Sequence, residues 1–87
     1  MIRVQTEDFN VANEYQALLK DNVADGAVVI FTGLVRDFNQ GQHVTGLALE
    51  HYPGMTEKVL KDIVQKAKTR WSLGQVRVIH RVGALEL

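Results

Sequence analysis

A run of nine residues, AVVIFTGLV at positions 27–35, constrains the fold more than any other part of this 87-residue chain. It has no charged side chain and is rich in β-branched and aromatic residues, which suits a central β-strand covered on both faces. It is far shorter than the roughly 20 apolar residues that a membrane-spanning helix needs. Gly33 within the run indicates a bulge or a close approach of the backbone.

Three further segments are predicted to be strands. Residues 44–52 are expected to return antiparallel to the apolar run across the polar loop DFNQGQH. Residues 2–6 alternate apolar and polar side chains, and residues 75–83 do so more clearly, with His80 on the apolar side. The final letters, GALEL, begin what resembles one more strand.

Two segments have the apolar spacing of helices. Asn10 is suited to cap a helix over residues 11–20, because its side-chain oxygen can accept a backbone N–H of the first turn. Glu14 is expected to face water on that helix. Residues 55–71 predict a longer helix. The order βαββαβ indicates an α+β domain with two helices on one face of a mostly antiparallel sheet, in a ferredoxin-like arrangement.

Length and composition limit the class of function. Eighty-seven residues form a single domain, because so short a chain has no volume for two cores. Ten basic residues balance ten acidic ones, so no overall charge attracts nucleic acid or an anionic membrane. The absence of cysteine excludes a disulfide framework and a cysteine nucleophile. Without an apolar signal region or membrane span, the protein is expected in the cytoplasm.

Arg36, directly after the apolar run, is the first candidate for chemistry. A guanidinium fork at a strand end suits a phosphate or a carboxylate. The alternative is a solvated arginine that pairs with Asp37. Position alone leaves both interpretations open.

The three histidines do not form a metal-binding pattern. His43, His51 and His80 are eight and twenty-nine residues apart, and there is no cysteine to join them. His80 is expected to be a hydrogen-bonded core or interface residue. Tyr52, in HYPGM, could stack on a planar ring, although this segment is more typical of a strand-to-helix turn. We therefore predict no resident metal or cofactor.

Three blocks of sequence occur in register along the chain: G-x-V-R-x-x-N at 33–39, E-H-Y-P-G-M at 50–55 and I-H-R-x-G at 79–83. Together they resemble the MoaE family, the large catalytic subunits of molybdopterin synthase, and the resemblance covers essentially the whole chain. It implies a fold described as an α/β hammerhead. It also implies a homodimer that binds one small subunit at each end.

The resemblance implies a sulfurtransferase of molybdenum cofactor biosynthesis, which converts cyclic pyranopterin monophosphate into molybdopterin. The two dithiolene sulfurs would arrive as thiocarboxylates on the C-terminal Gly-Gly tail of a small ubiquitin-like subunit, in agreement with the lack of cysteine. Arg36 matches the family arginine at the substrate pocket and is the implied catalytic residue. Leu34 and Val35 would contribute substrate contacts beside it.

The resemblance also implies pocket residues that have no counterpart here, namely a second His-Arg pair and two lysines. Residues 1–87 are therefore expected to be the N-terminal part of a longer domain and to be inactive alone. The alternative is a small non-catalytic module that binds a partner or effector through its sheet edge or the 36–43 loop, or an inactive relic of the family.

Overall fold

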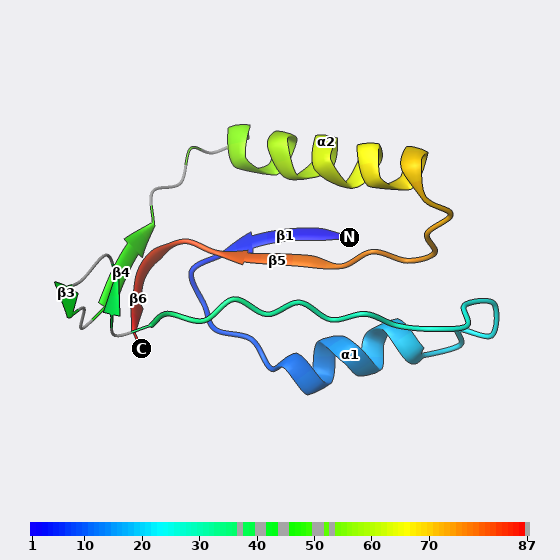
Figure 1. Cartoon of the computed structure of the whole chain (residues 1–87), viewed down its shortest axis with the longest axis horizontal. Coiled ribbons are helices and arrows are strands. Elements are labelled where there is room, and N and C mark those ends of the chain that lie inside the picture. The colour runs from blue at the N-terminus through cyan, green and yellow to red at the C-terminus, as the bar shows by residue number, and fades with distance from the viewer. Residues whose placement is uncertain (37, 40–41, 44–45, 50–51, 53, 87) are drawn as a thin grey trace.

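The computed structural model describes residues 1–36, 38–39, 42–43, 46–49, 52 and 54–86. The described residues form two helices and three pairs of short strands (Figure 1). The predicted α+β class is confirmed. Within the described part of the chain, neither helix has the length and apolar character needed to cross a membrane.

The central pair of strands, β1 (Ile2–Gln5) and β5 (Val78–Arg81), joins a segment near the N-terminus to one near the C-terminus. The two strands run parallel, with Ile2 opposite Val78. The ladder extends to the first residue, because the Met1 amine donates to the Val76 carbonyl at 2.6 Å and the Val78 N–H donates to the Met1 carbonyl at 2.9 Å. The alternating patterns of residues 2–6 and 75–83 thus predicted the two strands of this pair.

Helix α1 (Val11–Leu19) begins where the sequence predicts. The side-chain oxygen of Asn10 accepts the backbone N–H of Asn13 at 3.1 Å, which satisfies one of the free donors of the first turn. The helix ends at Leu19, one residue before the predicted boundary.

Helix α2 (Met55–Arg70) starts at a glycine turn. Gly54 has a φ of +84°, a conformation that residues with a Cβ adopt at a cost, and its N–H donates to Glu57 Oε2 at 2.8 Å. The helix packs along β1. The residues on its half-buried stripe include Leu60, Val64 and Ala67.

A sharp corner follows β5 and leads into the last strand, β6 (Gly83–Glu86). The Val82 N–H still donates to the Gln5 carbonyl at 2.9 Å, and Gly83 then turns the chain with a φ of +85°. Strand β6 pairs antiparallel with β4 (Gly46–Leu49). Among the described side chains, only those of the hydrophobic residues Val82 and Leu85 are buried, at 4 and 8% exposure, so the small core lies at this corner.

The loop before β4 contains a minimal hairpin. Strands β2 (Phe38–Asn39) and β3 (Gln42–His43) pair antiparallel, with Phe38 opposite His43. The segment predicted as a plain turn thus has strand pairing in its described residues.

The predicted central strand at residues 27–35 is wrong for this structure. These residues form no strand, and Val29, Phe31 and Leu34 are 90, 96 and 86% exposed. A β-strand requires a partner backbone. The described part of the expected hairpin partner, β4, pairs with β6 instead. The strands therefore form one parallel and two antiparallel pairs rather than a single mostly antiparallel sheet.

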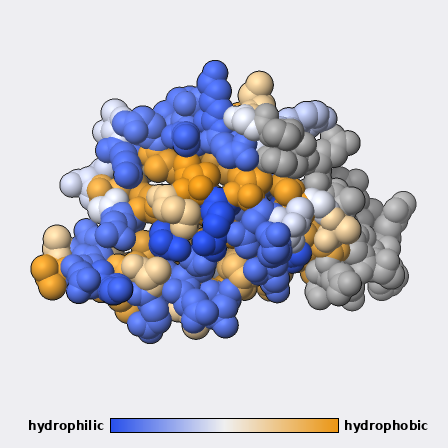
Figure 2. All heavy atoms as spheres, turned by 180° about the vertical axis from the view of Figure 1, so that it is seen from behind, coloured by the Kyte–Doolittle hydropathy of each residue, from blue (hydrophilic) through white to orange (hydrophobic). Residues whose placement is uncertain are grey.

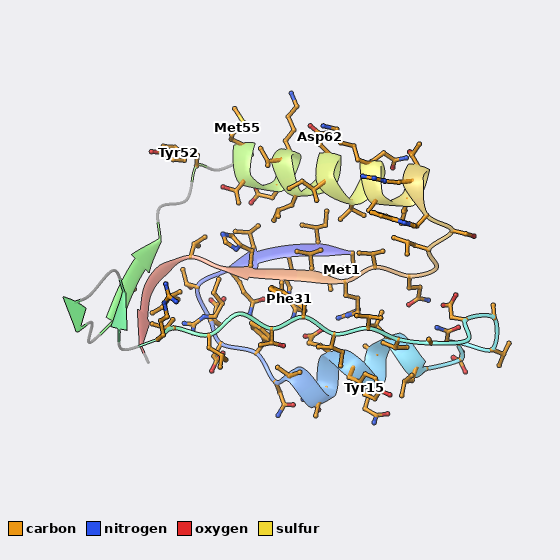
Figure 3. All side chains as sticks on the ribbon, in the orientation of Figure 1. Met1, Tyr15, Phe31, Tyr52, Met55 and Asp62 are labelled. Atoms are coloured by element: carbon orange, nitrogen blue, oxygen red, sulfur yellow. The ribbon has the colours of Figure 1, made fainter. Side chains whose placement is uncertain are left out.

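The helices lie on opposite sides of the central pair, not on one face as predicted (Figure 1). Arg3 lies opposite Ile79 in the parallel register, so the odd-numbered residues of both strands share a face. The side chains of Arg3 and Arg77 extend from this face to α1. Helix α2 covers the pair from the other side (Figure 3).

The fold exposes an unusually large surface. Its accessible area is 7225 Å², whereas a globular monomer of 9.8 kDa exposes roughly 5,200 Å². The radius of gyration is 15.2 Å, compared with about 12 Å for a compact domain of this length. The chain thus leaves uncovered much of the apolar surface that a closed domain would bury.

Candidate functional site

A cleft of about 570 Å³ separates α1, the extended segment at residues 29–35 and β5. Its lining is mixed. Apolar side chains of the lining include Tyr15, Leu18, Phe31 and Leu34, and its charged and titratable residues are Asp8, Glu14, Arg77, His80 and Arg81. The cleft therefore offers both apolar and polar surface to a ligand.

Glu14 is the most strongly bound polar group of this cleft. Its Oε1 accepts a hydrogen bond from Arg3 Nη2 at 2.5 Å, and its Oε2 accepts two from Arg77, from Nε at 3.0 Å and from Nη2 at 2.5 Å. The hydrogen bonds from Arg77 and then from Arg3 hold the pKa of Glu14 below its usual range. Glu14 stays ionised in the folded protein as a result.

The prediction that Glu14 faces water is wrong, since its side chain is only 18% exposed. The helical pattern classed it as polar and could not show what packs opposite it. A signal was present in the strands, where Arg3 and Arg77 both occupy polar positions of alternating segments. The pairing of β1 with β5 brings these two cations close together, and Glu14 binds both of them.

Arg81 ties the end of β5 to the chain that follows β1. Its Nε and Nη2 donate to the Thr6 carbonyl at 3.1 and 2.7 Å, and its Nη1 lies 3.8 Å from Asp8 Oδ1. With the buried Val82 and the positive φ of Gly83, these contacts give the I-H-R-x-G block a structural role at the corner. The sequence pattern alone did not indicate this role.

Two of the three predicted site residues line the cleft. Leu34 and Val35 both line it; Leu34 is exposed and Val35 is half-buried. Arg36, which follows them, is exposed and is not part of the lining. Asp37, its partner in the alternative interpretation, lies outside the described residues.

His80 and Tyr52 differ in their exposure to solvent. His80 is half-buried and lines the cleft, whereas His51 lies outside the described residues. The residues that the structure describes contain no group of three or more potential metal ligands. Tyr52 is 63% exposed, and its carbonyl accepts the N–H groups of Met55 and Thr56 at 3.0 and 3.2 Å. Tyr52 therefore takes part in the turn that starts α2 (Figure 3).

Comparison with known sequences gives one consistent result. The family model described as MoaE protein matches residues 4–87. The chain is 60% identical over 82 residues to the molybdopterin synthase catalytic subunit of Vibrio cholerae. The alignment covers 94% of this chain and 54% of that protein. It is 55% identical to the Escherichia coli protein of the same name, with 97 and 55% covered.

Solved structures agree with the sequence comparison. The chain superimposes on the molybdopterin biosynthesis MoaE protein of Burkholderia ambifaria with a TM-score of 0.81 and 44% identity, covering 98% of this chain and 56% of that one. The corresponding protein of Burkholderia multivorans gives the same TM-score at 49% identity. The chain thus spans about half the length of the curated relatives it matches.

Proposed function

The chain belongs to the MoaE family, and we propose that it is the N-terminal part of a molybdopterin synthase catalytic subunit. The observation that carries the proposal is the family match over residues 4–87, together with relatives of that name at 52–60% identity. The subunit transfers sulfur from the thiocarboxylated C-terminus of a small ubiquitin-like subunit to cyclic pyranopterin monophosphate and so forms the dithiolene. The comparisons give no support to a non-catalytic module.

The cleft is a suitable binding site for the tail of the small subunit that carries this sulfur. An extended tail ending in Gly-Gly has no side chains at its tip, so it can enter a narrow groove. The groove beside residues 31–35 is lined by both apolar and charged side chains. A volume of about 570 Å³ accommodates a few residues of an extended peptide.

Arg36 is assigned the catalytic role, with Leu34 and Val35 as substrate contacts. The guanidinium stays charged at all physiological pH values, and its planar fork matches a phosphate or a thiocarboxylate. It would hold the phosphate of the pterin or the negative charge that develops during sulfur transfer. The position of Leu34 and Val35 at the cleft is compatible with this assignment.

The remaining parts of the proposal follow from the family. The subunit forms a homodimer, binds one small subunit at each end, works in the cytoplasm and needs no resident cofactor. The 87 residues alone make no molybdopterin, because the lysines expected to act on the thiocarboxylate and the pterin are not among them.

The test is a joined protein in which this chain replaces the matching half of the Vibrio cholerae relative. Mixed with thiocarboxylated small subunit and cyclic pyranopterin monophosphate, it should form molybdopterin, whereas the 87-residue chain should not. A folded joined protein that binds the small subunit and yields no product would refute the proposal. Calorimetry with a small subunit lacking its last two glycines should show much weaker binding, and undiminished affinity would remove the tail from the groove.

A further inference from the structure

One close approach joins two turns that are far apart in the chain. The carboxylate of Asp25 lies against Gly74, so a Cβ added at Gly74 would lie 2.4 Å from both carboxylate oxygens, whereas ordinary contact begins at 3.4 Å. Gly74 does not have a positive φ, unlike Gly54 and Gly83. Glycine is therefore needed at position 74 for space and not for backbone conformation.

The Asp25 carboxylate is held in this place by Asn22. The Nδ2 of Asn22 donates to Asp25 Oδ2 at 2.8 Å and to the Leu18 carbonyl of α1 at 3.1 Å. The Oδ1 of Asn22 accepts the backbone N–H groups of Ala24 and Asp25 at 3.3 and 3.2 Å. The turn at residues 22–25 is thus one hydrogen-bonded unit attached to the end of α1. A side chain at position 74 would displace the carboxylate and disturb this unit.

The contact lies where two segments that bound the cleft begin. Residues 27–35 follow the turn directly, and β5 begins at Val78, shortly after Gly74. Both segments line the cleft, and they run in the same direction from this end of the molecule (Figure 1). Seen from behind, the turn projects at the same end, and its Val23 is 98% exposed (Figure 2). The position of the turn relative to β5 thus depends on its attachment to α1 and on the contact with Gly74.

The extended segment has few other attachments. Within the described part of the chain, residues 27–35 pair with no strand and form no hydrogen bond. Their separation from β5 is therefore not fixed by a ladder of backbone hydrogen bonds, as it would be in a sheet. The place from which they start decides how far from β5 they run.

A second cavity connects the contact with the cleft. Asp25 and Gly74 line this cavity, which has a volume of about 470 Å³. Leu18, Val29 and Arg77 line both this cavity and the cleft of about 570 Å³. A change in the separation of Asp25 and Gly74 would therefore alter the space that continues into the cleft.

We propose that Asp25 and Gly74 are positioning residues of the cleft. Their contact sets the separation of residues 27–35 from β5, and with it the width of the groove that receives the tail of the small subunit. Neither residue lines the groove itself, and both act through the segment that carries Leu34 and Val35. The inference deepens the proposed function and rests on it in taking the tail as the occupant.

The first test measures the separation of the two segments. The chain has no cysteine, so Thr32→Cys and Lys61→Cys, at two exposed positions, provide unique sites for nitroxide labels. The label at Lys61 reports on the central pair, because α2 packs along β1. Double electron–electron resonance should show a longer or broader distance distribution in Gly74→Ala. Adding Asp25→Ser makes room for the new Cβ and should restore the original distribution. Gly26→Ala, which adds a Cβ in open space, is the matched control.

The second test uses the joined protein with thiocarboxylated small subunit. In Gly74→Ala the KM for the small subunit should rise roughly tenfold with kcat little changed, because an altered groove loses binding that the ground state and the transition state share. Asp25→Ser in the same chain should restore the KM, a recovery that a general loss of stability does not give. Asp25→Glu lengthens the same side chain and should raise the KM with Gly74 intact, so the test does not depend on one variant folding.

An unchanged distance distribution in Gly74→Ala, an unchanged KM, or an equal change in Gly26→Ala would overturn the proposal. So would a double variant, Gly74→Ala with Asp25→Ser, that recovers neither quantity. A joined protein of unchanged sequence that makes no molybdopterin would count against the proposed function. The distance measurement would then still decide whether the contact of Asp25 with Gly74 positions residues 27–35.

Discussion

Glu14 and Arg77 are 63 positions apart in the chain, yet two hydrogen bonds from the guanidinium, at 3.0 and 2.5 Å, meet on one oxygen of the carboxylate. The second oxygen accepts from Arg3 at 2.5 Å. The side chain of Glu14 is thereby fixed to strand β1, through Arg3, and to Arg77, the residue immediately before β5. The side chains of Glu14 and Arg77 are 18 and 23% exposed, so salt screens this contact less than a surface ion pair.

This contact predicts an acid-sensitive fold. The pKa of Glu14 is lowered, chiefly by the Arg77 hydrogen bonds, from an ordinary value of 4.5. A depressed carboxyl pKa stabilises the fold above the unfolded value, and this stabilisation is lost as the pH falls from 4.5 through the lower folded pKa. Urea unfolding between pH 7 and pH 3 should show a loss of stability that Glu14→Gln reduces. Glu7→Gln, at an exposed position, is the control, and an unchanged pH slope in Glu14→Gln would contradict the prediction.

The cap of α1 predicts a second stability effect. Asn10→Ala removes the acceptor of the Asn13 N–H and should lower the free energy of unfolding by about 1 kcal/mol. Asn13→Ala keeps the backbone donor and serves as the matched control. Denaturant midpoints measured on both variants decide the point, and equal losses would mean that the cap has no specific effect.

Gly83 is expected to tolerate no side chain without strain. Its φ of +85° lies in the left-handed region, so Gly83→Ala should cost about 1 kcal/mol or more. Crowding is not the cause, because an added Cβ would lie 3.6 Å from Thr6 Cγ2, an ordinary contact. Gly26→Ala, in open space and without a positive φ, should change stability little. Thermal unfolding of the two variants side by side is the measurement.

Arg36 carries the functional prediction. In the joined protein, Arg36→Ala should lower molybdopterin formation at least tenfold, an effect of about 1.4 kcal/mol, with little change in folding. Arg36→Lys should restore activity only in part, because an ammonium keeps the charge and loses the bidentate fork. The surface interpretation predicts the reverse, a stability loss of about 0.5 kcal/mol with full activity. Product formation and unfolding, measured on the same preparations, separate the two.

Local sequence determined the elements whose stability is mostly local. The helical spacing and the Asn10 cap placed α1 within one residue of its observed end, and the pattern of residues 55–71 placed α2. Side-chain alternation found β1 and β5. The sequence blocks also predict Leu34, Val35 and Arg36 as site residues, of which Leu34 and Val35 line the cleft, and their roles stay predictions. Each of these inferences depends on neighbours in the chain or on a match to a family.

Only the tertiary structure decided the strand pairings and ion pairs whose partners are far apart in the sequence. Residues 27–35 have the composition of a central strand, yet they form none, because strand pairing needs a second backbone and the described part of β4 pairs with β6. Glu14 has the pattern of a solvent-exposed residue, yet it is held between Arg3 and Arg77, because the parallel register of β1 and β5 brings both cations to one face. Composition and periodicity describe what a segment can bury or expose, whereas the pairing of distant backbones and charges is fixed only when the chain folds.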